Sequence, residues 1–143
     1  TPSGDNAVRS CLRLMKIDTS SLTVSKTLDV GDFQTYFYYP AIQTDGSNNL
    51  IAVFSGSSAS QSLPVYASTG YASVYASGQL AGSSGFGIPV LIKSGGSTYT
   101  PSSRRFGDYS GAAIDPDGQT VWVAGEYALS PSEWGTAIAE VGF

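Results

Sequence analysis

The chain has 143 residues, only 13% of them charged, and a formal net charge of −4. This length allows one domain with a real core and is short for two. The acidic balance and the lack of a basic patch exclude nucleic acid as an expected partner. Histidine is absent, which removes the commonest general base, the usual metal ligand and the ordinary Ser-His-Asp triad.

Membrane and cofactor signals are also absent from the sequence. No run of about 18 apolar residues occurs, so we expect no transmembrane segment. No phosphate loop or nucleophile elbow is found, and we expect no cofactor. Few Lys with many Ser, Thr, Gly and Tyr is typical of exported bacterial proteins. The chain starts at Thr1 rather than Met, and we expect any signal peptide to lie outside it. We therefore expect a secreted, periplasmic or cell-surface protein.

Short strands separated by Gly, Ser, Asp and Pro turns are predicted along the whole chain, and no long window favours a helix. An all-β fold follows from this pattern. In chain order the expected strands are 9–17, 23–30, 38–44, 50–56, 63–68, 72–77, 89–95, 110–115, 120–128 and 134–143.

The first expected strand alternates between two faces. Cys11 and Met15 fall on one face, and Leu12 and Leu14 fall on the other. Cys11 is the single cysteine, so no intrachain disulfide can form. We expect it to be a buried apolar residue rather than a reactive thiol.

An internal match organises the rest of the chain. "AIQTDG" (41–46) and "AIDPDG" (113–118) match at an offset of 72 residues, each after aromatic residues such as Phe37 and Tyr109. An apolar strand follows each copy. Small residues in one strand and bulky ones in the next are typical of a four-stranded β-propeller blade, whose innermost strand is crowded near the central axis.

The blades can be assigned to segments of a single all-β domain, 1–143. Segment 36–97 would be one blade, with 63–68 and 89–95 as its outer strands, and 104–143 an incomplete one. Segment 7–31 would supply the outer strands of a preceding blade.

The motifs "RRFGDYSGAAIDPDGQTVWVAGEYA", "YYPAIQTDGSNNLIAVFSGSS" and "VRSCLRLMKIDTSSLTVSKTLDVG" resemble those of exported bacterial β-propeller repeat proteins with loosely sialidase-like blades. The resemblance covers roughly 7–141, and "FGDYSGAAIDPDG" is its most specific part. It implies a propeller fold and an exported location, but no particular reaction. Sialidase activity is not expected, since the Asp-box spacing and three converging arginines are missing.

The predicted strands amount to about two and a half blades, whereas closed propellers use about four to eight. We therefore expect a partial propeller: a fragment, a subunit docked on other chains, or a protomer that closes a ring with a copy of itself. Two copies would supply about five blades. A small self-contained β-sandwich is the alternative fold.

The aromatic segment "FQTYFYY" (33–39) and the segment "RRFGDYSG" (104–111) suggest a ligand or partner surface. The aromatics could instead fill the wedge between adjoining blades, or stack on a sugar. The residues expected at this surface are Phe33, Tyr36, Phe37, Tyr38, Tyr39, Arg104, Arg105, Asp108 and Tyr109.

Acidic residues offer two further hypotheses. Asp115 and Asp117 in "DPDG" are weak candidates for calcium ligands, although Pro second and Gly fourth favour a plain turn. A glycosidase would use Asp108, Tyr109 and Glu126, but Asp108 is expected to be a salt-bridge partner of Arg104 or Arg105.

Binding or assembly without catalysis is the function that the sequence favours, in a homo-oligomer or with other protein subunits. A structural subunit of an extracellular or membrane-associated complex belongs to this class. The alternative is a glycan-active enzyme of the glycoside hydrolase type or a lectin-like carbohydrate binder. Loss of glycoside turnover in Asp108→Asn would favour the enzyme, and loss of sugar binding in Tyr→Ala variants would favour the lectin.

Overall fold

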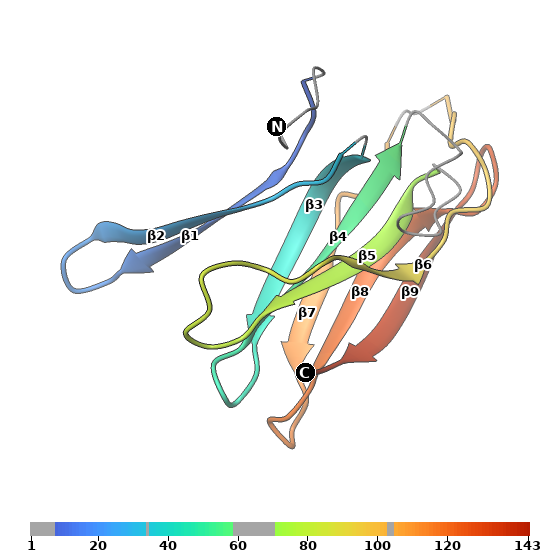
Figure 1. Cartoon of the computed structure of the whole chain (residues 1–143). Coiled ribbons are helices and arrows are strands. Elements are labelled where there is room, and N and C mark those ends of the chain that lie inside the picture. The colour runs from blue at the N-terminus through green and yellow to red at the C-terminus, as the bar shows by residue number, and fades with distance from the viewer. Residues whose placement is uncertain (1–7, 34, 59–70, 103–104) are drawn as a thin grey trace.

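The computed structural model shows an all-β protein (Figure 1). It describes residues 8–33, 35–58, 71–102 and 105–143. These residues form nine strands and no helix. The described part of the chain therefore contains no helix that could cross a membrane. The prediction of an all-β fold is therefore confirmed.

Three antiparallel sheets follow one another along the chain, with two, four and three strands. Within each sheet, strands that are consecutive in sequence are hydrogen-bonded neighbours. The first sheet contains β1 (Leu12–Asp18) and β2 (Thr23–Val30); the second contains β3 (Thr35–Thr44), β4 (Leu50–Ser58), β5 (Ser73–Gln79) and β6 (Val90–Lys93); the third contains β7 (Gly111–Ile114), β8 (Val121–Ala128) and β9 (Trp134–Val141).

The first sheet is a hairpin that projects from the rest of the molecule, and we call it the arm (residues 12–30; Figure 1). At its base, Leu12 and Val30 are buried. Its tip is closed by Asp18, whose Oδ1 accepts hydrogen bonds from the backbone N–H groups two and three residues on, both at 2.9 Å. This is the local turn that an Asp side chain favours.

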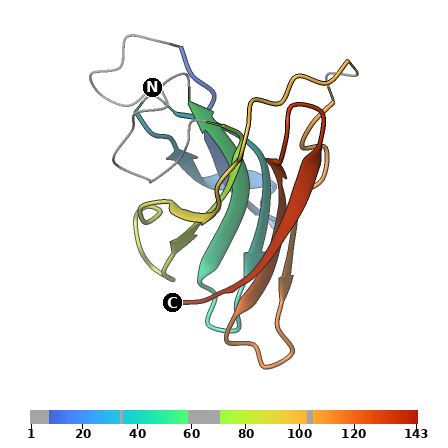
Figure 2. The same cartoon turned by 90° about the vertical axis from the view of Figure 1, so that its right-hand side faces the viewer.

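The second sheet lies between the arm and the third sheet, so both of its faces are covered (Figure 2). Alternate residues of β4 point to opposite faces, and each set enters a different core. The core toward the arm contains Leu12, Leu14, Val30, Phe37, Ala52, Phe54 and Tyr75, and the core toward the third sheet contains Ile51, Val53, Val74, Val121 and Val123.

The turns that follow β3 and β7 share a backbone hydrogen bond between their fourth and first residues. The N–H of Asn48 donates to the carbonyl of Asp45 at 3.1 Å, and the N–H of Gly118 donates to the carbonyl of Asp115 at 2.8 Å. Asn48 and Gly118 both have positive φ. The turns thus correspond at an offset of 70 residues. The sequence match has an offset of 72, because Asp-Gly is the first pair of residues in one turn and the last pair in the other.

These two turns are also in direct contact. The N–H of Gly46 donates to the carbonyl oxygen of Gly118 at 2.7 Å. A Cβ at Gly46 would approach that oxygen to 2.8 Å, which is too close for any side chain. A glycine is therefore required at position 46 by the packing of one turn on the other.

Two predictions at the level of single elements are wrong. Segment 63–68 lies outside the described residues, and the place predicted for it in the second sheet is taken by β5, which pairs with both β4 and β6. The sequence could not separate them, because "PVYAS" (64–68) and "SVYAS" (73–77) are nearly identical. Cys11 is exposed rather than buried, because Leu12 takes the inward position next to it.

Candidate interaction surfaces

Phe37 of the aromatic segment is a core residue. It is 1% exposed, and its ring centroid lies 4.8 Å from that of Phe54 and 5.8 Å from that of Tyr75. Its inclusion in a ligand surface is therefore wrong, and it fills the space between the arm and the second sheet. The hypothesis that these aromatics fill a wedge between adjoining blades stays a prediction.

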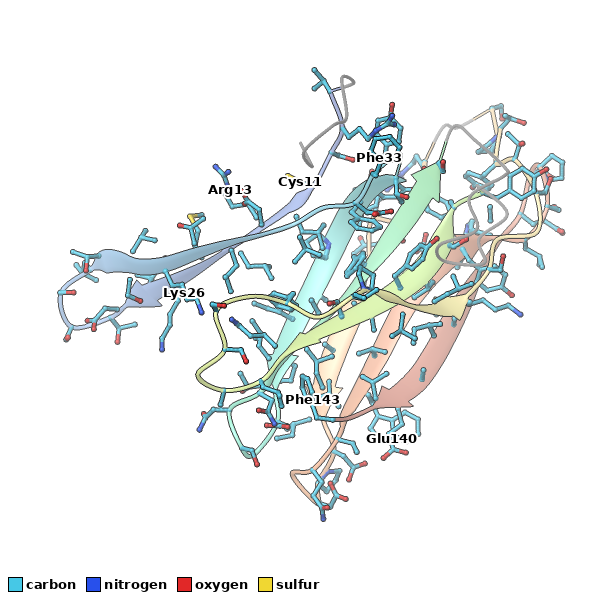
Figure 3. All side chains as sticks on the ribbon, viewed as in Figure 1. Cys11, Arg13, Lys26, Phe33, Glu140 and Phe143 are labelled. Atoms are coloured by element: carbon cyan, nitrogen blue, oxygen red, sulfur yellow. The ribbon has the colours of Figure 1, made fainter. Side chains whose placement is uncertain are left out.

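The neighbouring aromatics are closer to solvent. Tyr36 is half-buried, with the guanidinium of Arg9 over its ring at 5.0 Å from the centroid. Tyr38 and Tyr39 meet edge to face with centroids 5.4 Å apart, and burial raises the pKa of Tyr38. Phe33 is exposed at the start of the second sheet (Figure 3).

Tyr39 joins the two predicted segments into one corner of the molecule. Its carbonyl accepts a hydrogen bond from Ser110 Oγ at 2.8 Å. Its ring packs against Gly107, whose positive φ and missing side chain allow that contact. The N–H of Gly107 in turn donates to Glu126 Oε2 at 2.8 Å. Residues 71 positions apart in sequence thus meet at this corner.

The rest of the corner is an exposed ion pair and an exposed ring. Arg105 Nη2 donates to Asp108 Oδ2 at 2.7 Å, and this hydrogen bond raises the pKa of Arg105. The predicted salt bridge is confirmed for Arg105, whereas Arg104 lies outside the described residues. Tyr109 is 79% exposed. The Asp108 and Glu126 carboxylates thus accept hydrogen bonds that hold the 105–110 loop.

Asp115 and Asp117 stabilise the turn after β7. Asp115 Oδ1 accepts the N–H of Asp117 at 3.0 Å, and its Oδ2 accepts the indole Nε1–H of Trp122 at 2.7 Å. These hydrogen bonds, first that from the backbone of Asp117, lower the pKa of Asp115. In the described part of the chain, no three Cys, His, Asp or Glu residues come together as a metal site would need.

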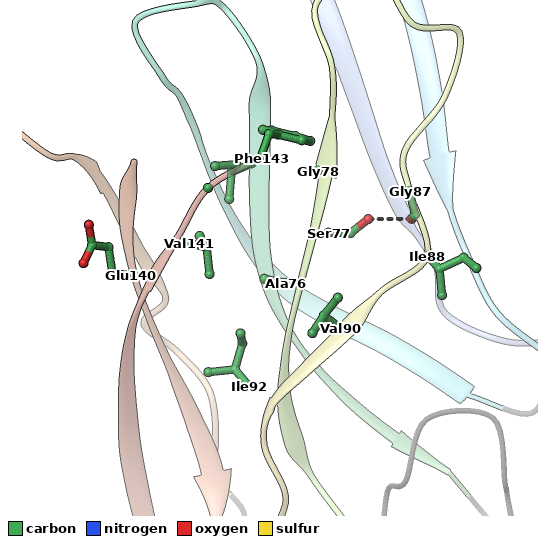
Figure 4. A pocket seen from close by; sticks show the side chains of 12 residues that line it. Ala76, Ser77, Gly78, Gly87, Ile88, Val90, Ile92, Glu140, Val141 and Phe143 are labelled. Atoms are coloured by element: carbon green, nitrogen blue, oxygen red, sulfur yellow. Dashed lines mark hydrogen bonds between the residues drawn. The ribbon is translucent and has the colours of Figure 1, made fainter. Parts of the chain in front are cut away.

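A groove of about 470 Å³ lies between the second sheet and the C-terminal end of β9 (Figure 4). The ring of Phe143 packs directly on Gly78 at its floor. Glu140, its one charged lining residue, accepts a hydrogen bond from Thr120 Oγ1 at 2.7 Å. Its lining is Ile51, Ala76, Ser77, Gly78, Gly87, Ile88, Val90, Ile92, Glu140, Val141, Gly142 and Phe143.

The side of the third sheet away from the second sheet, which we call the end face, carries large exposed apolar side chains together with Glu126, Thr136 and Glu140. The pairing of β8 with β9 is regular along all eight residues, and Trp122 pairs with Glu140 while Ala124 pairs with Ile138. Side chains of these pairs share one face. Trp122 is 43%, Trp134 53% and Ile138 69% exposed. Both tryptophans of the chain therefore lie on this face.

No protein-family model, curated protein or solved structure matches this chain. The resemblance to exported β-propeller repeat proteins therefore stays a prediction from sequence motifs. The surfaces described above carry the case for a function.

Sequence reasoning missed the end face and the groove. The sequence did contain a signal for the end face. In the alternating strand "TVWVAGEYA", Trp122 falls on the same face as the polar Glu126, and Val121 and Val123 fall on the other face. The groove had none, since its walls come from β4, β5, β6 and the C-terminus, which only the folded chain brings together.

Proposed function

We propose that the chain is a non-catalytic assembly module of an exported protein. Its three sheets act as propeller-like blades, and the open ends of the stack are covered by other subunits. The observation that carries the proposal is the end face, where two tryptophans and an isoleucine are exposed on one side of a sheet whose other side is packed. Large apolar side chains exposed on one face mark interaction sites when they gather there, and here they are interspersed with Glu126, Thr136 and Glu140.

The way the second and third sheets stack supports the comparison with blades. β3 contacts β7 and β4 contacts β8, so the first two strands of each sheet face their counterparts. β9, the third strand of its sheet, contacts β6 rather than β5. The two turns after β3 and β7 also touch at equivalent ends. A propeller is likewise a series of antiparallel sheets that follow one another along the chain.

The incompleteness of the third sheet is a second support. It has three strands where the second sheet has four. β9 leaves one edge without a paired strand in the described residues, and its sequence "WGTAIAEV" contains neither Lys nor Pro. Natural proteins protect exposed edges with such residues, or with bulges, or cover them. The edge is therefore of the kind that a partner covers.

The native mass tests the proposal, measured by light scattering after size exclusion on the chain alone and on the protein isolated from its source. We expect the source material to have a mass greater than the 14.8 kDa of one chain. Tryptophan emission gives a parallel readout, because both indoles lie on the end face: in the assembly they should be shielded from acrylamide and emit at shorter wavelength.

A single-site variant separates assembly from folding. Ile138→Lys places a charge on the end face at a residue that is 69% exposed, so it should leave the fold intact and reduce the native mass. Ile88→Lys is the matched control, since Ile88 is 77% exposed and lies on the groove rather than on the end face. A mass of one chain in the source material, with freely quenched tryptophans, would contradict the proposal.

A further inference from the structure

The arm has an apolar strip that its own chain leaves uncovered. Met15, Ile17 and Val24 are each more than half exposed. Met15 and Ile17 are two residues apart on β1 and so lie on one face. Ile17 pairs with Val24 across the hairpin, just beyond a register shift between Lys16 and Ile17. Leu12 and Leu14 lie on the opposite face and pack on the second sheet.

The arm is held in this projecting position by its own chain. Arg13 forms two hydrogen bonds across the hairpin to Asp29, at 2.8 and 2.9 Å, which fix the two strands to each other. Lys26 donates to the carbonyl oxygen of Ser83 at 2.7 Å. Lys26 and Arg13 project from opposite sides of the arm (Figure 3). The apolar strip is thus presented on an ordered element.

The two ends of the stack carry opposite net charges. The arm, residues 12–30, contains three cations and two carboxylates, a net charge of +1. Residues 105–143 contain one cation, Arg105, and six carboxylates, a net charge of −5. Charges of opposite sign attract the arm of one molecule toward the third sheet of another, and they oppose the pairing of two third sheets.

We propose that the end face binds the arm of a second copy of this chain. The inference rests on the proposed function, and it names the partner. The Met15 strip of the arm covers Trp122, Trp134 and Ile138 of the second copy, so the stack of sheets continues across the boundary in the same order as within one chain. Each copy has one arm and one end face, so two copies that form both contacts close on themselves and leave neither end open.

Disulfide trapping between two different variants tests the contact. Cys11 is the only cysteine, so Cys11→Ser gives a background without thiols. In that background Met15→Cys and Ile138→Cys are made separately, mixed in equal amounts and oxidised. Because a disulfide needs Cα atoms within about 7 Å, we expect mixed 15–138 dimers and few 15–15 or 138–138 dimers.

The control replaces Ile138→Cys by Leu80→Cys. Leu80 is 52% exposed, against 69% for Ile138, and it follows β5 in the second sheet. The mixed disulfide with Ile138→Cys should form at least about tenfold faster than with Leu80→Cys, since binding raises the local concentration to about millimolar. The unmodified chain should have twice the mass of one chain at low salt. Half a molar salt should reduce that fraction, because it screens the opposite charges.

Three outcomes would overturn the inference. A monomer at every concentration excludes the second copy, and a preference for 138–138 dimers would show that two end faces meet instead. In the third outcome the purified chain is a monomer, but the complex from the source contains other chains that shield the tryptophans. The partner would then not be a second copy, while the proposed assembly function would stand.

Discussion

The second and third sheets are built from similar strands in a similar order, but they differ in how many of their faces are covered. The central β4 is buried over six consecutive residues, 51–56, whereas the central β8 alternates between buried and more exposed positions. The sequences reflect this difference, because "LIAVFSG" is apolar on both faces and "VWVAGEYA" carries Glu126 on one of them. A sheet buried on both sides has near-continuous apolar strands.

The exception in this comparison is Trp122. A sheet with one solvent-facing side usually has polar residues there, yet β8 has its largest side chain at an outward position, next to Ala124 and opposite Glu140. The end face is therefore intermediate between the doubly covered second sheet and an ordinary solvent face. That intermediate character is what an interface covered only in the assembly would show.

The largest effect is expected from removing a ring at the centre of the second sheet. Phe54 is fully buried and packs against Phe37 and Tyr75, so Phe54→Ala should lower the free energy of unfolding by about 3–5 kcal/mol. Trp122→Ala, a larger truncation on the third sheet, should cost about 1 kcal/mol or less in the monomer. Urea unfolding of both variants measures the difference, and equal losses would contradict the contrast between the two sheets.

A smaller effect is expected from adding one methyl group between the sheets. A Cβ at Gly125 would lie 2.9 Å from Val74 Cγ1, and both partners are in the packed space between β8 and β5. Gly125→Ala should therefore lower the free energy of unfolding by about 1–3 kcal/mol. Gly111→Ala is the control, because a Cβ there would meet only Ala124 Cβ at 3.9 Å. If both variants were equally stable, the packing between the sheets would be looser than the structure shows.

Acid should weaken both turns that follow β3 and β7. Burial disfavours the ionised form of Asp45, but hydrogen bonds from Asn49 and Ser47 more than offset it, and its pKa is lowered. The pKa of Asp115 is lowered by hydrogen bonds from Asp117 and Trp122. Because the unfolded chain binds protons first, near pH 3.9, these carboxylates stabilise the fold above that pH and lose the effect as pH falls through their lowered pKa values.

The midpoint of urea unfolding, measured from pH 6 down to pH 2.5, checks this expectation. The midpoint should be steady above about pH 5 and fall below about pH 4. Asp45→Asn and Asp115→Asn should each flatten part of that fall. A midpoint that rises on acidification would contradict the lowered pKa values in both turns.

The strands could be predicted from the sequence because their signals are local. Alternation and turn residues place β2 at 23–30, the same bounds that the structure gives. The third strand of the second sheet could not be placed, because 63–68 and 73–77 carry the same local pattern and only pairing with β4 distinguishes them. The Asp-Gly match misaligned the two turns by two residues for a similar reason. The residues that correspond in the structure are Asn48 and Gly118, which both have positive φ, and Asn and Gly are not matched in the sequence.

The candidate surfaces were less predictable because they depend on contacts between segments. Tyr39 of the aromatic segment contacts the 105–110 loop, and Asp108 pairs with Arg105 as predicted. The ligand or partner surface expected from these two segments stays a prediction. It could not tell that Phe37 points into the core while Tyr39 packs on Gly107. Neighbouring aromatics in one strand alternate in direction, and a bulge between Tyr38 and Ala41 changes that alternation just where the corner begins.

The smallest effect is expected at the exposed ion pair of the corner. Asp108→Asn removes the charge that pairs with Arg105, and since both side chains are largely in solvent, the unfolding midpoint should not change measurably. The variant also tests the glycan-active alternative, which needs the Asp108 carboxylate. Wild type and Asp108→Asn should be equally inactive on aryl glycosides, with Asp29→Asn as a control for charge. Turnover by the wild type that disappears in Asp108→Asn alone would replace the assembly proposal with an enzymatic one, and the exposed Tyr109 beside it would then be the next residue to change.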